Sequence, residues 1–206
     1  MLILIDNIHI CYASIRHNAS KSGITVVIFV ANDCDALCAC RILASLFKSD
    51  SIQYTIIPTF SYTDIEINFN SIKTNTSLKS IVFLNCGGQI DLTDKWFGQK
   101  DSKIDCYLFD SHRPIHHNNI NQNDNIIVVD DGVSKLKECP LSEDIIDIEA
   151  PYEEEKSNEE EKETNNAQKN KEIYLARINK MKTYYGGSFY GKSCILFGIH
   201  AGKITQ

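Results

Sequence analysis

The sequence contains no apolar run near the length of about 20 residues that a membrane-spanning helix needs. Its apolar amino terminus, MLILIDNIHI, is short and contains Asp6. This segment also lacks the basic leader and the small-residue cleavage site of a secretory signal. We therefore expect an intracellular, soluble protein that does not associate with a membrane.

Positive charge is scarce, with 21 Lys and Arg residues against 27 Asp and Glu residues, a formal net charge of -6. A protein that coats nucleic acid generally needs a basic face, so the composition disfavours that class. It still allows a protein partner or a local basic groove. A chain of 206 residues, 43% of them hydrophobic, can bury one core, which predicts one domain with appendages.

Paired CxxC motifs are absent, although the chain has eight cysteines. Cys34, Cys38 and Cys40 lie in or beside one predicted helix and have no fourth metal ligand nearby in the sequence. This spacing favours neither a zinc site nor a disulfide framework. We expect buried free thiols in a reducing compartment.

The segment 25–47 contains the clearest structural pattern. Residues 26–30 have the length and β-branched content of a strand that is buried on both faces. A short polar turn follows, and a helical period begins at Ala36. Asp33 and Asp35 therefore lie at the carboxyl end of a parallel strand, where open α/β sheets bind ligands. Asp35 is also placed to cap the helix. The residues expected on the core side of this helix are Leu37, Ile42, Leu43, Leu46 and Phe47.

Further strands are predicted at 52–57, 79–84, 104–109 and 126–129, the first of them ended by Pro58. Helical patterns are weak at 4–15 and clearer at 63–69. The alternation of these segments predicts an α/β fold, a doubly wound and mostly parallel sheet with flanking helices.

The composition divides the chain into three parts. Residues 1–141 form the α/β domain, and residues 142–172 form an acidic insert that is expected to be solvated and disordered. Residues 173–206 are expected to continue the domain as helix. Since the sequence stops soon after an apolar helix begins at Ser193, we expect a truncated chain.

Four side chains are candidates for one site. Asp33, Asp35, Asp110 and His112 all follow predicted strands and are expected near the same edge of the sheet. Carboxylates and an imidazole suit Mn²⁺ or Mg²⁺, which activates water against a phosphoester. Helix capping explains the same carboxylates without a metal. For Arg113, both a contact to phosphate and a role in holding its own loop are open.

Several segments resemble the eukaryotic replication factors of the cell division cycle protein forty-five family. The resemblance depends on VANDCDALCACRIL, VFLNCGGQIDL, LFDSHRP and YYGGSFYGKS, and it covers about residues 25–139 before it resumes near residue 183. The family descends from the DHH phosphoesterases, the superfamily that includes the bacterial RecJ nuclease. The resemblance therefore implies a DHH phosphoesterase-like fold.

The same resemblance implies that metal ligands have been lost. Asp33, Asp35, Asp110 and His112 match ligand positions of active DHH enzymes. Four positions differ from the active enzymes. Ala31 replaces an acidic or His ligand, and Ala36 replaces Gly. Asn85 replaces Asp, and Ser111 replaces the first His of the DHH motif. Each lost ligand weakens metal binding by about tenfold or more. We expect a pseudoenzyme with no cofactor, whose vestigial site is formed by Asp33, Asp35, Asn85, Asp110, Ser111 and His112.

By this resemblance, the protein is expected to be a non-catalytic DNA replication initiation factor in the nucleus. It would be a scaffold subunit that joins the MCM ring and the GINS complex in the replicative helicase, with a weak contact to single-stranded DNA. The alternative is a Mn-dependent DHH-family phosphoesterase or single-strand exonuclease. Asn85 and Ser111 distinguish the two, because both replace metal ligands.

Overall fold

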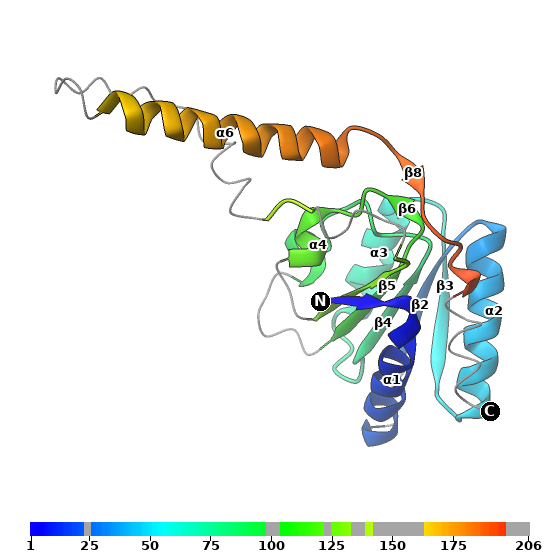
Figure 1. The fold of residues 1–206 in the computed structure, drawn as a ribbon. Helices are drawn as coiled ribbons and strands as arrows, with labels where there is room; N and C mark the ends of the chain where they lie inside the picture. The colour runs from blue at the N-terminus through cyan, green and yellow to red at the C-terminus, as the bar shows by residue number, and fades with distance from the viewer. Residues whose placement is uncertain (23–25, 98–103, 122–124, 133–138, 142–162, 197–206) are drawn as a thin grey trace.

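The computed structural model describes residues 1–22, 26–97, 104–121, 125–132, 139–141 and 163–196. Its main sheet has six strands in the order β1-β7-β5-β4-β2-β3, and all neighbours in it are parallel (Figure 1). The strands are β1 Leu2–Leu4, β2 Val26–Ala31, β3 Tyr54–Thr59, β4 Ser80–Leu84, β5 Asp105–Phe109 and β7 Ile126–Asp130. The predicted mostly parallel α/β fold is confirmed.

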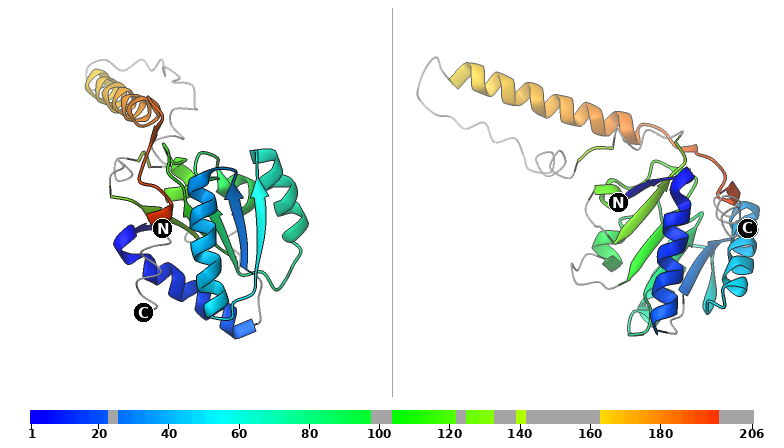
Figure 2. Two further views of the ribbon diagram at one scale, coloured as in Figure 1. Left: turned by 90° about the vertical axis from the view of Figure 1, so that its right-hand side faces the viewer. Right: turned by 60° about the horizontal axis from the view of Figure 1, so that its bottom comes forward.

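Helices cover both faces of this sheet (Figure 2). On one face are α1 (Ile8–Ser22) and α2 (Cys34–Ser49), and on the other are α3 (Tyr62–Ile72) and α4 (His117–Asn121). A 3-10 turn, η1 (Ile5–Asn7), precedes α1, and a short π-helical segment, η2 (Thr93–Phe97), follows β4. Two separate apolar clusters result, one on each face, as a doubly wound sheet requires.

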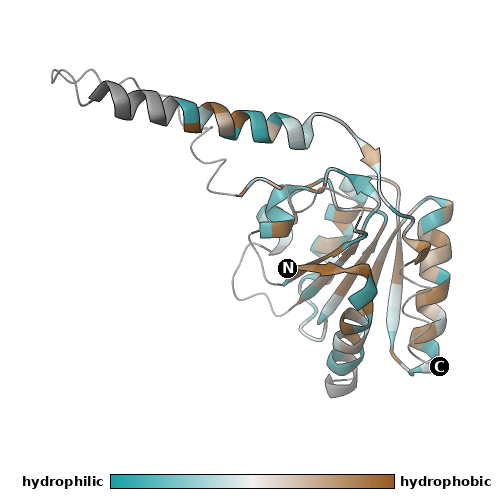
Figure 3. Cartoon of the chain, viewed as in Figure 1, coloured by the Kyte–Doolittle hydropathy of each residue, from teal (hydrophilic) through white to brown (hydrophobic). Residues whose placement is uncertain are grey.

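The strands fill both clusters because alternate residues of a strand point to opposite faces. Ile28 of β2 faces α1 and α2, whereas Phe29 faces α3 and stacks on Phe83 with ring centroids 5.0 Å apart. Every residue of β4 and of β7 is buried, and the central strands are apolar along their length (Figure 3). Full burial of each such side chain stabilises the fold by about 1.5–3 kcal/mol.

The amino terminus differs from the sequence prediction. Leu2–Leu4 form strand β1, which pairs with β7 at one edge of the sheet, and the helix α1 begins only at Ile8. A strand this short has too few residues to show an alternating pattern of apolar and polar side chains. Its conformation is imposed by pairing with β7, which the local sequence does not reveal.

Two details around β3 also differ. Pro58 lies inside β3, paired with Val30, rather than ending the strand. The position is tolerated because β3 is an edge strand, which leaves one side of its backbone without a partner strand. In α2, Leu43 and Phe47 are buried as expected, but Leu37 is 55% exposed, because the buried stripe is completed by Ala36, Ala39 and Cys40 instead.

The strand order places a switch point between β2 and β4. From β2 the chain moves outward to β3, and then it returns to form β4 on the other side of β2. In open α/β sheets the crevice at the carboxyl ends of two such strands is the usual ligand site. Asp33 follows β2 and Asn85 follows β4, so both lie at this crevice.

Residues 186–196 return to the same edge and are called the returning segment. Helix α6 (Glu163–Tyr185) projects away from the sheet, and β8 (Phe189–Tyr190) pairs antiparallel with β6 (His112–Arg113) (Figure 1). Helix α6 begins inside the segment expected to be an insert, whereas the disorder predicted for 142–162 lies outside the described residues. The helix expected from Ser193 is described only as far as Leu196. None of the helices in the described ranges is long and apolar enough to cross a membrane.

Candidate functional site

Asp33 uses both of its carboxylate oxygens at the carboxyl end of β2. Its Oδ1 accepts a hydrogen bond of 2.8 Å from the backbone N–H of Ala36, which makes Asp33 the N-cap of α2. An N-cap of this kind stabilises a helix by about 0.5–2 kcal/mol. Its Oδ2 accepts a bond of 3.0 Å from the side-chain amide of Asn85. The capping role predicted for Asp35 therefore belongs to Asp33.

Asn85 bridges Asp33 to Ser111 across the switch point. Its Oδ1 accepts hydrogen bonds from the backbone N–H of Ser111, at 3.0 Å, and from the Ser111 hydroxyl, at 2.6 Å. Because a backbone N–H can only donate, the Asn85 oxygen must face Ser111 and its NH₂ group must face Asp33. Asn85 also has a φ of 55°, a left-handed conformation that Asn tolerates better than most residues.

Asp110 is almost completely buried and accepts three hydrogen bonds. Its Oδ2 accepts from the backbone N–H of Gly88 at 2.8 Å, and its Oδ1 accepts from the backbone N–H of His112 at 2.9 Å. The third bond joins Oδ1 to Nδ1 of the His112 ring at 2.7 Å. This bond raises the pKa of His112 above its usual value, although partial burial opposes the shift.

Asp35 holds the carboxyl-terminal segment. It accepts hydrogen bonds from the Ser193 hydroxyl, from the backbone N–H of Cys194 at 2.7 Å and from the backbone N–H of Ile195 at 3.1 Å. Burial acts to raise the pKa of Asp35, but these bonds outweigh it and leave the pKa below its usual value. Asp35 thus caps the turn at Ser193 rather than α2.

Arg113 holds its own loop, one of the two roles left open by the sequence. Its guanidinium is buried, donates to the backbone carbonyls of Asp110 and His112, and pairs with Asp131 at 3.3 Å. Asp131 also accepts from the backbone N–H of Lys192 at 2.7 Å. The ion pair therefore joins β6 to the loop after β7, and the bond from Lys192 attaches the segment after β8 to the same carboxylate.

The donor set does not fit a two-manganese centre of the DHH type. The NH₂ group of Asn85 directs its hydrogens at Asp33, where a cation would need a lone pair. Asp35 is committed to a different segment, and Asp110 has three protein donors. Among the described residues, no group of three His, Cys, Asp or Glu side chains is arranged to hold a metal ion.

The family model described as CDC45 matches residues 26–195, which include the crevice and the returning segment. The chain belongs to the CDC45 family. Its sequence is 41% identical over 113 residues to the cell division control protein 45 homologue of Dictyostelium discoideum, covering 55% of this chain and 17% of that protein. Over 122 residues it is 43% identical to the Schizosaccharomyces pombe homologue, covering 59% of this chain and 19% of that protein.

A solved CDC45 structure has a similar fold. The crystal structure of CDC45 from Entamoeba histolytica is 25% identical, with a TM-score of 0.57, and the match covers 65% of this chain and 26% of that one. The chain spans about a fifth of the length of the curated CDC45 relatives that it matches.

Sequence reasoning missed two parts of this CDC45-family site, Asp131 and Gly191. Asp131 follows β7 at the same sheet edge as Asp110, and this position was the available signal, but its partner Arg113 lies in β6. The local sequence around Gly191 does not indicate that this residue belongs to the site. A side chain there would overlap Asp131, so only Gly allows the returning segment to pass this close.

All eight cysteines are free, and six are buried as predicted, whereas Cys34 and Cys38 are exposed on the first turns of α2.

Proposed function

We propose that this chain is the DHH-like part of a non-catalytic DNA replication initiation factor that acts in the nucleus. In this role it is a scaffold subunit that joins the MCM ring to the GINS complex in the replicative helicase. Membership of the CDC45 family supports the proposal, since its curated members are named cell division control proteins. We include a weak contact with single-stranded DNA, because a net charge of -6 does not favour a strong one.

The observation that supports catalytic silence is the direction of the Asn85 amide. A dinuclear centre concentrates about four positive charges, and anionic or imidazole ligands must offset the desolvation of those ions. At this crevice Asn85 donates to Asp33 and accepts from Ser111, so the two substituted positions complete a hydrogen-bond network. Protein donors thus occupy the carboxylate that a metal would otherwise need.

In this proposal the retained carboxylates stabilise the fold. Asp33 fixes the start of α2, Asp110 fixes the loops after β4 and β5, and Asp35 fixes the segment at Ser193. These structural roles are consistent with a protein that presents surfaces to partners. Changing Asp33 to Ala is expected to lower stability by about 1–2 kcal/mol and to remove no catalytic activity.

Labelled single-stranded DNA and excess Mn²⁺ test catalytic silence directly. We expect the chain to release no nucleotides, and Mn-dependent turnover would overturn the proposal in favour of an exonuclease. The double variant Asn85→Asp, Ser111→His restores two ligand types at the crevice. We expect tighter Mn²⁺ binding by this variant than by the unmodified chain, as measured from the free Mn²⁺ signal in electron paramagnetic resonance.

The partners need a separate experiment. Full-length protein is purified from replicating cells, and co-purification with MCM and GINS is expected. Recovery without either complex would contradict the scaffold role, whatever the outcome of the nuclease assay.

A further inference from the structure

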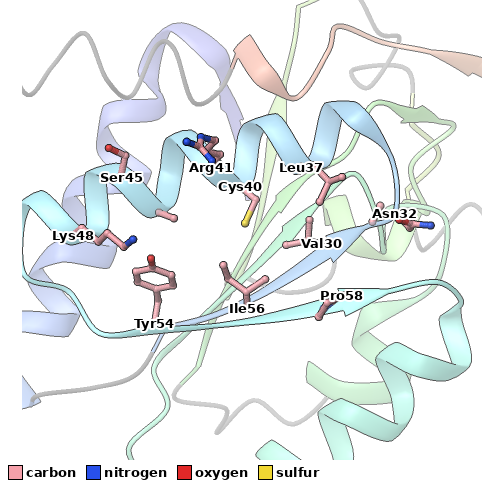
Figure 4. A pocket seen from close by; sticks show the side chains of 12 residues that line it. Val30, Asn32, Leu37, Cys40, Arg41, Ser45, Lys48, Tyr54, Ile56 and Pro58 are labelled. Atoms are coloured by element: carbon pink, nitrogen blue, oxygen red, sulfur yellow. The ribbon is translucent and has the colours of Figure 1, made fainter.

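A groove of about 530 Å³ separates α2 from the edge strand β3 (Figure 4). It lies on the face of the sheet that α2 covers, and at one end it is lined by Ala31 and Asn32, which adjoin the crevice. The groove exists because β3 has no neighbouring strand on its outer side and α2 does not extend over it. It is therefore a feature of the sheet edge, separate from the carboxylate network.

One stripe of α2 forms the helix side of the groove. Its residues recur at the spacing that puts side chains on a single helical face: Leu37, Cys40, Arg41, Ala44, Ser45 and Lys48. Ala44 and Ser45 lie in the middle of this stripe, and because they are small they leave space above β3. The stripe that packs into the core, centred on Leu43 and Phe47, lies beside this one, and Cys40 belongs to both.

Alternate residues of β3 form the opposite side. Tyr54, Ile56 and Pro58 face the stripe of α2, as the side-chain alternation of a strand requires (Figure 4). Ile56 is 43% exposed, and Leu37 across the groove is 55% exposed. The groove thus exposes apolar side chains to solvent on both of its sides.

The charges of the groove have one sign. Arg41 and Lys48 are the charged residues among the twelve that line it, and none is acidic. Neither forms an ion pair with another residue in the described part of the chain. A purely basic rim is notable in a chain with a net charge of -6. It selects for a negatively charged occupant.

We propose that this groove binds an acidic amphipathic helix of a partner protein. From Leu37 to Lys48 the stripe is about 16 Å long, which matches about three turns of a docked helix. Arg41 and Lys48 are two helical turns apart, about 10 Å, so the occupant carries acidic side chains about two turns apart beside an apolar stripe. An added β-strand fits less well, since Pro58 offers no N–H at the edge of β3.

This inference does not depend on catalytic silence or on MCM and GINS. It rests on the shape, the exposed apolar side chains and the charge of a surface that is distinct from the network around Asn85. Its test therefore uses the chain by itself with a synthetic probe.

The probe is a fluorescein-labelled helical peptide of about 14 residues, with Leu in one stripe and two Glu residues two turns apart. Its binding to the 206-residue chain is followed by fluorescence anisotropy, and chemical-shift changes locate the contact. The test variant is Arg41→Glu, Lys48→Glu. The matched control is Lys73→Glu, Lys182→Glu, which changes the net charge equally at exposed positions away from the groove.

We expect saturable binding with a dissociation constant in the micromolar range, shifts in α2 and β3, and about tenfold weaker binding for the test variant only. Equal weakening by both variants would show non-specific attraction and overturn the proposal. Absence of binding at about 1 mM peptide would also overturn it. So would self-association of the chain through α2 and β3, which would identify a second copy as the occupant.

Discussion

Asn85→Asp is the substitution that most sharply probes the hydrogen-bond network. The change keeps the shape of the side chain, and Asp tolerates the left-handed conformation of this residue about as well as Asn does. The oxygen that accepts from Ser111 is kept. The NH₂ group that donates to Asp33 at 3.0 Å is replaced by a second carboxylate oxygen.

Two effects destabilise the variant at neutral pH. A hydrogen bond to a charged group contributes about 1.5–3 kcal/mol, and it is lost. Two unit charges about 4 Å apart repel each other by about 4 kcal/mol at an effective dielectric constant of 20. Asp33 is only half-buried, so solvent screens much of this repulsion. We expect the free energy of unfolding to fall by about 2–4 kcal/mol.

The pH dependence identifies the cause. Repulsion raises the pKa of the carboxylate pair in the folded state above the unfolded value of about 3.9. The destabilisation is therefore largest at about pH 7.5 and shrinks as the pH falls through the raised pKa, because one carboxyl then becomes a donor to the other. Urea denaturation of Asn85→Asp and of the unmodified chain at about pH 7.5 and pH 5.5 measures both effects.

Asn75→Asp is the matched control, because Asn75 is exposed and its side-chain oxygen accepts from the backbone N–H of Ser77. We expect this variant to lose less than about 0.5 kcal/mol. The reasoning would be refuted by equal stability of Asn85→Asp and the unmodified chain at about pH 7.5, or by a loss that grows toward acid.

Two further predictions concern the returning segment. Gly191→Ala places a methyl group against the buried carboxylate of Asp131, so we expect a loss of about 1–3 kcal/mol and faster amide exchange after α6, whereas Gly187→Ala, where the space is open, should change neither. Asp35→Asn weakens the bonds to Ser193 and its neighbours, and we expect a loss of about 1–2 kcal/mol at neutral pH. Because the folded pKa of Asp35 is depressed, its contribution is present above about pH 4 and is lost as the pH falls through the folded pKa, so the difference between this variant and the unmodified chain should vanish in acid. Equal exchange rates in the two Gly variants would contradict the first prediction, and a pH-independent difference would contradict the second.

Much of the fold was predictable because its strands are buried on both faces. The sequence shows uninterrupted apolar runs at β2, β4, β5 and β7, and the polar turns that follow them make these runs easy to recognise. Strand β1 was not predictable, because pairing with β7 alone defines it. For α2 the sequence predicted the helix but not which of its faces packs against the sheet. Small Ala residues are buried in the core, whereas the larger Leu37 is exposed.

For the candidate site, the sequence predicted which side chains gather at the sheet edge better than it predicted their partners. Asp33, Asp110 and His112 follow strands, and their position is fixed by topology. That Asp33 rather than Asp35 caps α2 depends on where the helix begins, which the pattern resolves only to within a few residues. The attachment of Asp35 to Ser193 joins positions far apart in the chain, so local sequence contains no signal for it.

A Mn²⁺ titration of the unmodified chain, followed by electron paramagnetic resonance at neutral pH, tests the central claim most directly. The claim is that Asn85, Ser111 and the carboxylates of the crevice bind one another in place of metal ions. We expect the free Mn²⁺ signal to rise in proportion to added metal, without saturable uptake below about 1 mM. Tight uptake of two ions per chain, abolished by Asp110→Asn, would contradict the account.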